Sequence, residues 1–319
     1  MRFVVFGAGA VGGVVAGRLF EAGHDIVAIA RGAHFEAVRD GGLRLVDPDR
    51  KVTLAIPVVD DPARVEWRAG DVVLATMKTQ DSAAAFGALA AAAGADVPVV
   101  CVQNGVENER IALRRFANVY GICVMLPAEH LEPGVVAASS APISGLLDIG
   151  RYPTGLDDTA HEIAAAIAGA TFESIPRPDV MRWKYAKLLM NLANAVEALC
   201  APGDDANELS KRARREGVEV LRAAGIDFAS VEEDRERRGT RLTPRLARGG
   251  GSTWQSLRRG TGSLETDYLN GEIALLARTH GVACPANALL QSAANDAARR
   301  GTAPGSRRAS DLLAELGPA

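Results

Sequence analysis

The stretch RFVVFGAGAVG, residues 2–12, decides the fold of this 319-residue chain. Residues 3–6 are apolar and either β-branched or aromatic, so we predict a buried strand over 2–6 that ends at Gly7. Residues 11–21 have helical spacing and stop before Gly23, a common helix terminator. Residues 25–30 predict a second strand. A strand, a helix and a strand in this order form a βαβ unit, which implies a parallel sheet.

The glycines of residues 7–12 have the spacing GxGxxG directly after the first predicted strand. Gly7 would permit the tight turn, Gly9 the close approach of a pyrophosphate, and Gly12 the close packing of helix on strand. The helix N-terminus would offer N–H groups and a positive dipole to the phosphates. An ordinary tight turn is the alternative, but the βαβ context favours a Rossmann dinucleotide-binding domain. The expected cofactor contacts in this turn are Gly7, Ala8, Gly9, Ala10, Val11 and Gly12.

The end of the second predicted strand distinguishes between cofactors. NAD sites usually carry an acidic residue there, whereas this chain has Ala30-Arg31-Gly32. An arginine without a neighbouring carboxylate suits a 2′-phosphate, so we expect NADP(H), with an ordinary surface arginine as the alternative. Lys78 follows the predicted strand 72–77 at another carboxyl end of the same sheet. It is a second candidate contact for phosphate or ribose.

The remaining pattern predicts an α/β fold with an N-terminal Rossmann domain and an all-helical C-terminal domain. Residues 135–138 and 143–149 have the pattern of a hairpin. From residue 179 onward helical patterns dominate, and Pro176-Arg177-Pro178 disfavours a continuous helix or central strand. We therefore predict a Rossmann NADP-binding domain over 1–176 and a helical substrate-binding and catalytic domain over 177–319.

Composition excludes several classes of function. A net charge of −3 gives no basic field for nucleic acid, and the arginine clusters at 212–215 and 235–238 alternate with glutamates like solvated helix faces. Outside the glycine-interrupted N-terminus there is no apolar run long enough for a membrane span, and that N-terminus lacks the charged segment and cleavage site of a signal peptide. We expect a cytoplasmic protein. The four cysteines and five histidines lack metal-ligand spacing, so we expect no metal site.

Three groups of polar residues are candidates for the chemistry. Asn104, in Gln103-Asn104-Gly105, follows the predicted strand 97–102 at a carboxyl edge, although Asn-Gly is also a common turn. Lys187, Asn191 and Asn194 have the spacing i, i+4, i+7, which places them on one helix face beside apolar residues. Such groups are costly unless paired, so they serve either a site or interdomain hydrogen bonds. Ser252 and Glu265 form the third group, with a helix cap and a solvated first-turn carboxylate as their alternatives.

Taken in order, these residues resemble the ketopantoate reductases (2-dehydropantoate 2-reductases) over nearly the whole chain. The resemblance rests on residues 7–13, Met77-Lys78, residues 103–105, Lys187 with Asn191, and Ser252 followed by residues 265–271. It implies a Rossmann domain joined to a helical domain with the substrate in the cleft between them. The implied activity is NADPH-dependent reduction of ketopantoate to pantoate, a step of pantothenate biosynthesis.

The resemblance also implies roles for individual residues. Lys187 would be the general acid that protonates the ketone oxygen, and Asn104 would fix either the nicotinamide or Lys187. Asn191 would bind the substrate, with Asn194 as a further candidate. Ser252 would bind the carboxylate of the 2-oxo acid, and Glu265 would accept a hydrogen bond from its hydroxyl. The expected catalytic residues are Lys187, Glu265 and Asn104.

Several residues depart from the family pattern, all on the substrate side. Ala195 stands where the family commonly has a second asparagine, which leaves Asn194 one residue early, and Gly249 and Ser256 replace a usual asparagine and aspartate. The stretch 252–265 is one residue longer than usual. A related dehydrogenase for a different 2-oxo or 3-hydroxy acid therefore remains an alternative, as does a catalytically silent NADP(H)-binding sensor. Apolar faces at 274–277 and 286–290 would serve a core or a homodimer equally well.

Overall fold

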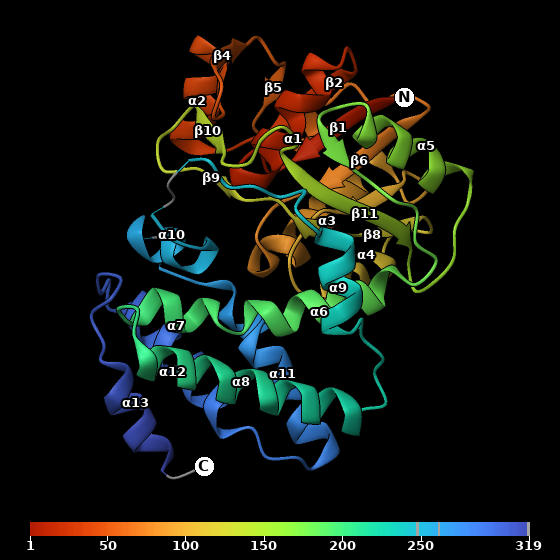
Figure 1. The fold of residues 1–319 in the computed structure, drawn as a ribbon. Helices are drawn as coiled ribbons and strands as arrows, with labels where there is room; N and C mark the ends of the chain where they lie inside the picture. Colours follow the sequence, from red (N-terminus) through yellow and green to blue (C-terminus); the bar gives the residue numbers. More distant parts are fainter. Residues whose placement is uncertain (247–248, 261, 318–319) are drawn as a thin grey trace. The chain divides into compact units, whose positions relative to one another are not determined.

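The computed structural model describes residues 1–246, 249–260 and 262–317 (Figure 1). These residues form two compact units. The first comprises residues 1–184 and 230–246, and the second comprises residues 185–229 and 249–317. We describe each unit separately.

The first unit is built on an eight-stranded sheet with the order β12-β11-β8-β7-β6-β1-β2-β5. Neighbouring strands are parallel except β8 and β11, which are antiparallel. In register, Phe3 of β1 lies opposite Ile26 on one side and Val72 on the other. The strands are β1 (Arg2–Phe6), β2 (Asp25–Ile29), β5 (Val58–Val59), β6 (Asp71–Ala75), β7 (Val99–Cys101), β8 (Val119–Met125), β11 (Gly145–Arg151) and β12 (Phe172–Glu173).

Helices cover both faces of this sheet, which is why β1 is apolar without alternation. Phe3 and Val5 belong to the core cluster that includes residues of α1 and α5, while Val4 and Phe6 belong to a second cluster with residues of α3 and α4. This arrangement confirms the predicted Rossmann-type domain. The helices of the unit are α1 (Ala10–Glu21), α2 (Gly32–Gly41), η1 (Pro62–Arg64), α3 (Thr79–Ala93), α4 (Asn108–Leu113), α5 (Asp158–Ala168), α9 (Val231–Arg238) and the first turn of α6 (Val180–Asn191).

A second, four-stranded sheet corrects the predicted hairpin. Its order is β4-β3-β10-β9, with β3 at Leu43–Val46, β4 at Lys51–Leu54, β9 at Ala128–Glu129 and β10 at Val135–Ala138. β10 pairs with β3 and β9, whereas β11 pairs with β8 and β12 in the large sheet. The hairpin of residues 135–138 and 143–149 is therefore wrong, because the two strands have different partners. The sequence analysis also did not predict the three short strands β3, β4 and β5, which lie within residues 43–59.

The arginine cluster at 235–238 is only partly the solvated helix face that composition suggested, because Arg235 is exposed but Arg237 is not. Arg237 is buried, and its guanidinium donates to both carboxylate oxygens of Asp148 at 2.8 and 2.7 Å. It also donates to Glu173 at 2.9 Å, and Arg177 donates to Asp148 at 2.7 Å. Burial alone would raise the pKa of Asp148, but the hydrogen bonds from the two arginines hold it below its ordinary value. These contacts dock α9 against the edge of the large sheet.

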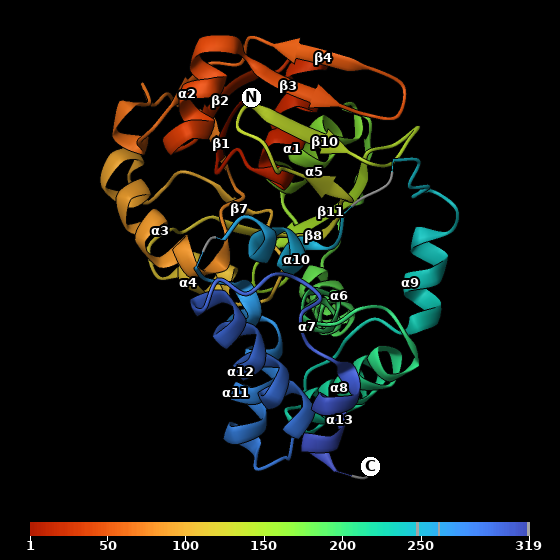
Figure 2. The same ribbon diagram turned by 90° about the vertical axis from the view of Figure 1, so that its left-hand side faces the viewer.

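Among the described residues of the second unit, the regular elements are all helices, as predicted, and they are joined by turns and loops. α8 closely approaches the end of α6 and the turn that follows it: a Cβ added to Gly217 would lie 2.7 Å from Leu192 and 2.8 Å from Leu189. α11 and α12 pack side by side (Figure 2). Ala274, Ala277, Ala286 and Leu290 are buried and belong to the core of this chain, whereas Leu275 is 53% exposed. Besides the rest of α6, the helices are α7 (Asn194–Leu199), α8 (Asp204–Ala223), α10 (Ser252–Arg258), η2 (Glu265–Tyr268), α11 (Asn270–His280), α12 (Pro285–Arg299) and α13 (Ala309–Leu316).

The two compact units change over inside α6, between Lys184 and Tyr185, and residues 230–246 return to the first unit. The predicted domain boundary between residues 176 and 177 therefore stays a prediction. The segment before α13 is held by backbone hydrogen bonds from Gly305 to Ala198 at 3.0 Å and from Arg307 to Leu199 at 2.9 Å.

Candidate dinucleotide and catalytic sites

Two of the three motif glycines are required by the packing of the chain itself. Gly7 has φ +106°, and a Cβ there would lie 2.7 Å from the Met77 nitrogen. A Cβ on Gly12 would lie 2.3 Å from the Thr76 hydroxyl oxygen and 2.4 Å from the Gly7 carbonyl. The Thr76 hydroxyl donates to that carbonyl at 2.8 Å. The turn, α1 and the end of β6 therefore fit together only with glycine at both positions.

Gly9 differs from both. Its φ is −73°, a value that residues with side chains adopt, and a Cβ there would meet no heavy atom within 4 Å. Gly9 is the N-cap residue of α1, where no side chain caps the helix and the first turn holds no acidic residue. The uncapped N-terminus and the open space before it fit a pyrophosphate, which needs both the N–H groups and a close approach.

The loops after β2 and β6 carry the two candidate cations of the dinucleotide site. Arg31 is exposed at the N-cap position of α2, and Lys78 is half-buried at the N-cap position of α3. Because β6, β1 and β2 are adjacent and parallel, both loops lie at the same sheet edge as the glycine turn. The structure thus brings Arg31, Lys78 and residues 7–12 to one edge.

Asn104 joins this edge through a buried hydrogen-bond network. The Gln103 amide donates to the Met77 carbonyl at 2.7 Å and to the Ser82 hydroxyl at 2.9 Å. The Asn108 amide donates to the Asn104 carbonyl at 3.1 Å, and its oxygen accepts from Ser82 at 2.7 Å. The loop with Lys78 and the loop with Asn104 are therefore held by the same side chains.

A buried ion pair that sequence reasoning missed supports the Asn104 loop. Lys184 and Glu109 are both buried, with 2.8 Å between Nζ and Oε1. Lys184 also donates to the carbonyls of Gln103 at 2.8 Å and Ile122 at 3.1 Å. Burial raises the pKa of Glu109, and the charge of Lys184 counteracts that rise. Neither residue stands out in the sequence, because each lies in an ordinary helical pattern and they are distant along the chain.

In the second unit, Lys187 and Asn191 share α6, as expected from their spacing. Asn194 does not: α6 ends at Asn191, a turn follows, and Asn194 begins α7. The prediction that all three residues lie on one face of the same helix is therefore wrong for Asn194. The turn is stabilised from α11, since the Asn270 amide donates to the Leu192 carbonyl at 3.1 Å.

A chain of buried amides supports this turn. The Asn287 oxygen accepts from Asn270 at 3.1 Å, and the Asn287 amide donates to the Ala213 carbonyl at 2.8 Å. The Glu216 carboxylate accepts from the backbone N–H groups of Ala286 and Asn287 at 2.8 and 2.9 Å, which caps α12. The α6–α7 turn is thus connected through α11 to α8 and α12.

Ser252 and Glu265 lie on elements that adjoin the same turn. Ser252 is the first residue of α10 and is not its cap, because Gly251 holds that position and makes no side-chain cap. The Gly251 N–H donates to Glu197 of α7 at 3.0 Å. Glu265 begins η2, which leads into α11, and it is buried at 7% exposure and not solvated. Residue 261, in the stretch that joins them, lies outside the described residues.

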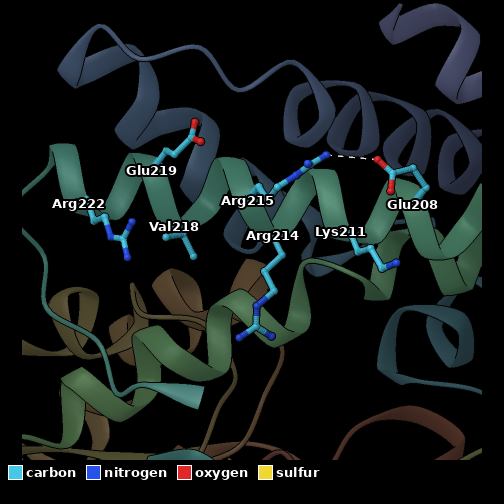
Figure 3. Close-up of a pocket in the computed structure, with 7 residues that line it drawn as sticks. All are labelled: Glu208, Lys211, Arg214, Arg215, Val218, Glu219 and Arg222. Atoms are coloured by element: carbon cyan, nitrogen blue, oxygen red, sulfur yellow. Dashed lines mark hydrogen bonds and ion pairs between the residues drawn. The ribbon is translucent and has the colours of Figure 1, made fainter. Parts of the chain in front are cut away.

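A cavity of about 440 Å³ on the second unit contains none of the predicted site residues (Figure 3). It is lined from α8 by Glu208, Lys211, Arg214, Arg215, Val218, Glu219 and Arg222. In the part of the chain that the structure describes, no group of three or more His, Cys, Asp or Glu side chains is arranged to hold a metal. Nor does any helix within the described ranges have the length and apolar character needed to cross a membrane.

Two family models match most of the chain. Residues 3–153 match "Ketopantoate reductase PanE/ApbA", and residues 179–298 match "Ketopantoate reductase PanE/ApbA C terminal". The chain belongs to the ketopantoate reductase family. A 2-dehydropantoate 2-reductase of Halobacterium salinarum is 31% identical over 302 residues, which cover 89% of this chain and 95% of that protein. Membership makes the chain an oxidoreductase of the nicotinamide-dinucleotide-dependent class acting on CH–OH groups.

Solved structures agree with this family assignment. A ketopantoate reductase of this family from Ralstonia eutropha has a TM-score of 0.80 at 28% identity, covering 94% of this chain and 99% of that one. A D-mandelate dehydrogenase with NADH and anilino(oxo)acetate has the same TM-score of 0.80 at 20% identity, over 94% of this chain and 99% of that one. The second likeness shows only that the fold is shared.

Proposed function

We propose that this member of the ketopantoate reductase family reduces a 2-oxo acid to a 2-hydroxy acid with NADPH, and that ketopantoate is the substrate. The observation that carries the proposal is the open space in front of Gly9, at an uncapped helix N-terminus of a family member. NADPH, when bound there, supplies the hydride. The relatives named 2-dehydropantoate 2-reductase support a 2-oxo acid substrate.

Arg31 supports NADPH over NADH. It is exposed at the end of β2 and follows Ala30 with no carboxylate in the adjoining residues 30–33. A guanidinium matches the geometry of a 2′-phosphate through charge-assisted hydrogen bonds. Lys78, half-buried at the neighbouring loop, is the second proposed contact with phosphate or ribose.

Lys187 is the proposed general acid. An ammonium polarises the ketone carbonyl and then delivers a proton from Nζ to the oxygen that becomes the hydroxyl. Asn191, one helical turn later on α6 and buried, is proposed to hold the substrate, with Asn194 at the start of α7 as a further contact. Asn104 is proposed to fix the nicotinamide end or Lys187.

Ser252 and Glu265 are proposed to orient the substrate from its two ends. A hydroxyl at the start of α10 suits the carboxylate of the acid, while a buried carboxylate suits the substrate hydroxyl.

Ala195, Gly249 and Ser256 depart from the family pattern on the substrate side. They support a second candidate, a related dehydrogenase acting on a different 2-oxo or 3-hydroxy acid. A catalytically silent NADP(H) sensor would need neither Lys187 nor Glu265, so the presence of both residues favours an enzyme over a sensor. Cytoplasmic location and a homodimer stay predictions.

Steady-state oxidation of NADPH at 340 nm tests the proposal. Ketopantoate, pyruvate and 2-oxoisovalerate are compared, each with NADPH and with NADH. Saturable turnover confined to ketopantoate and NADPH is the expected result. Turnover with another acid would favour the second candidate, and tight NADPH binding without turnover on any acid would favour the sensor.

A further inference from the structure

His34, in the first turn of α2, bonds the backbone of two segments that are distant in sequence. Its Nε2 lies 2.7 Å from the carbonyl oxygen of Ala8, in the glycine turn. Its Nδ1 accepts the N–H of Gly134 at 2.9 Å. Because Nδ1 is an acceptor, the ring proton lies on Nε2 and is donated to Ala8.

The surroundings of His34 favour this neutral ring. The ring is half-buried and packs edge-on against His130, with 4.3 Å between ring centroids. Burial, followed by the proximity of His130, lowers the pKa of His34 below its ordinary value. His130 is itself fixed by a 2.9 Å hydrogen bond to the Val135 carbonyl. At neutral pH the imidazole thus has one donor and one acceptor, and both are used.

The glycine turn is held by the β2–α2 segment through both polar groups of Ala8. The Ala8 N–H donates to the Ile29 carbonyl at 3.2 Å, and its C=O accepts from His34. The Ala8 carbonyl belongs to the same planar peptide as the Gly9 nitrogen, so fixing one fixes the other. Gly134 (φ +76°) is pressed against α2, where a Cβ would lie 3.0 Å from Ala37. The ring therefore joins the turn before α1, the start of α2 and the loop before β10.

We infer that His34 is a positioning residue for the dinucleotide: it holds the Ala8–Gly9 peptide, whose N–H donates to the Gly7 carbonyl at 2.7 Å, in the conformation that leaves the N-terminus of α1 open to the pyrophosphate, and it ties this peptide to the loop that carries Arg31. The inference rests on the proposed function, because it assumes that NADPH binds at Gly9 and Arg31. His34 acts through the backbone of Ala8 and needs no contact with the reacting atoms. Its loss should therefore weaken cofactor binding and leave the chemical step unchanged.

A pair of amide substitutions separates the two hydrogen bonds of the ring. In His34→Gln the amide nitrogen matches the reach of Nε2 and retains the donor to Ala8. In His34→Asn the amide oxygen matches Nδ1 and retains only the acceptor for Gly134. His34→Ala removes both, and His161→Ala, an exposed histidine on α5 of the same unit, is the control.

The readout is the Kd of NADPH, measured by fluorescence titration without substrate, alongside thermal melting and steady-state kinetics. We expect His34→Ala and His34→Asn to bind NADPH about five- to tenfold more weakly, as loss of one hydrogen bond predicts, and His34→Gln and His161→Ala to stay near the wild type. KM for NADPH should rise in the first two while kcat changes by less than about twofold.

Equal NADPH affinity in His34→Asn and His34→Gln would overturn the inference, even if both variants melt earlier. Unchanged affinity in His34→Ala would overturn it as well. Failure of the wild type to bind NADPH would instead refute the proposed function, and the positioning role with it. The wild-type titration therefore distinguishes the two failures.

Discussion

The glycine turn and the α6–α7 turn lie in different units and are built in opposite ways. The glycine turn depends on backbone conformation and close packing within a few consecutive residues, since Gly7 and Gly12 are each required by atoms beside them. The α6–α7 turn depends on side chains from distant helices, namely Asn270, Asn287 and Glu216. A site defined by backbone geometry can be recognised in a short motif, whereas a site supported by distant side chains cannot.

The largest expected effect is on the chemistry assigned to α6. Lys187→Ala should lower kcat about 10²- to 10⁴-fold, the range for a lost general acid, while the Kd of NADPH stays unchanged. Stopped-flow or steady-state kinetics beside a fluorescence titration would measure both. Lys211→Ala, which removes an exposed lysine of α8, is the control. Wild-type turnover in Lys187→Ala would remove this residue from the mechanism.

The second effect concerns the ion pair beside the Asn104 loop. Lys184→Met leaves the Glu109 carboxylate buried without its cation, which should cost about 3–5 kcal/mol in the free energy of unfolding. Urea denaturation measures it. The double variant Lys184→Met with Glu109→Leu should recover much of the loss, because no buried charge remains. Arg308→Ala, which breaks an exposed ion pair with Asp311, should leave the midpoint unchanged. A single variant as stable as the wild type would show that the pair does not support the loop.

Third, Arg31→Asp should reduce the preference for NADPH over NADH. The lost charge-assisted contacts correspond to about 1.5–3 kcal/mol, or roughly 10- to 100-fold in the ratio of the two kcat/KM values. Arg39→Asp, an exposed arginine later on the same helix, controls for the change in charge. An unaltered ratio in Arg31→Asp would refute the assignment of the 2′-phosphate contact.

The smallest expected effect is on the support of the α6–α7 turn. Asn270→Ala removes the donor to the Leu192 carbonyl and to Asn287, which should cost about 1–3 kcal/mol in unfolding free energy. It should also lower kcat/KM for the 2-oxo acid without changing NADPH affinity. Asn207→Ala, on an exposed position of α8, is the control. If NADPH affinity fell and substrate kinetics stayed constant, the assignment of cofactor binding to the glycine turn and of substrate binding to the α6–α7 turn would be wrong.

The sequence predicted what local rules determine. The βαβ order, the glycine turn and the helical second half followed from periodicity and motif, and the structure confirms them. The hairpin prediction failed because β10 and β11 find different partners, and strand pairing over long separations leaves no local signal. Arg237 looked solvated for the same reason: its partner Asp148 is remote in sequence.

On the candidate site, the sequence placed each residue at the end of a strand or on a helix, but it could not show which side chains support these elements. Lys187 and Asn191 share a helix as their spacing predicted, whereas the break before Asn194 depends on a hydrogen bond from α11. Lys184 was missed because a buried lysine in a helical pattern looks like any other until Glu109 is placed beside it.

One measurement tests most directly whether the glycine turn is built for the cofactor. Gly9→Ala should melt at the wild-type temperature without cofactor, because its methyl group meets nothing within 4 Å. It should nevertheless lose about 1–3 kcal/mol of NADPH binding, since the methyl group would occupy the space left for the pyrophosphate. The paired variant Gly12→Ala should instead melt earlier, because its methyl group would collide with Thr76. NADPH affinity equal to the wild type in Gly9→Ala would contradict the account.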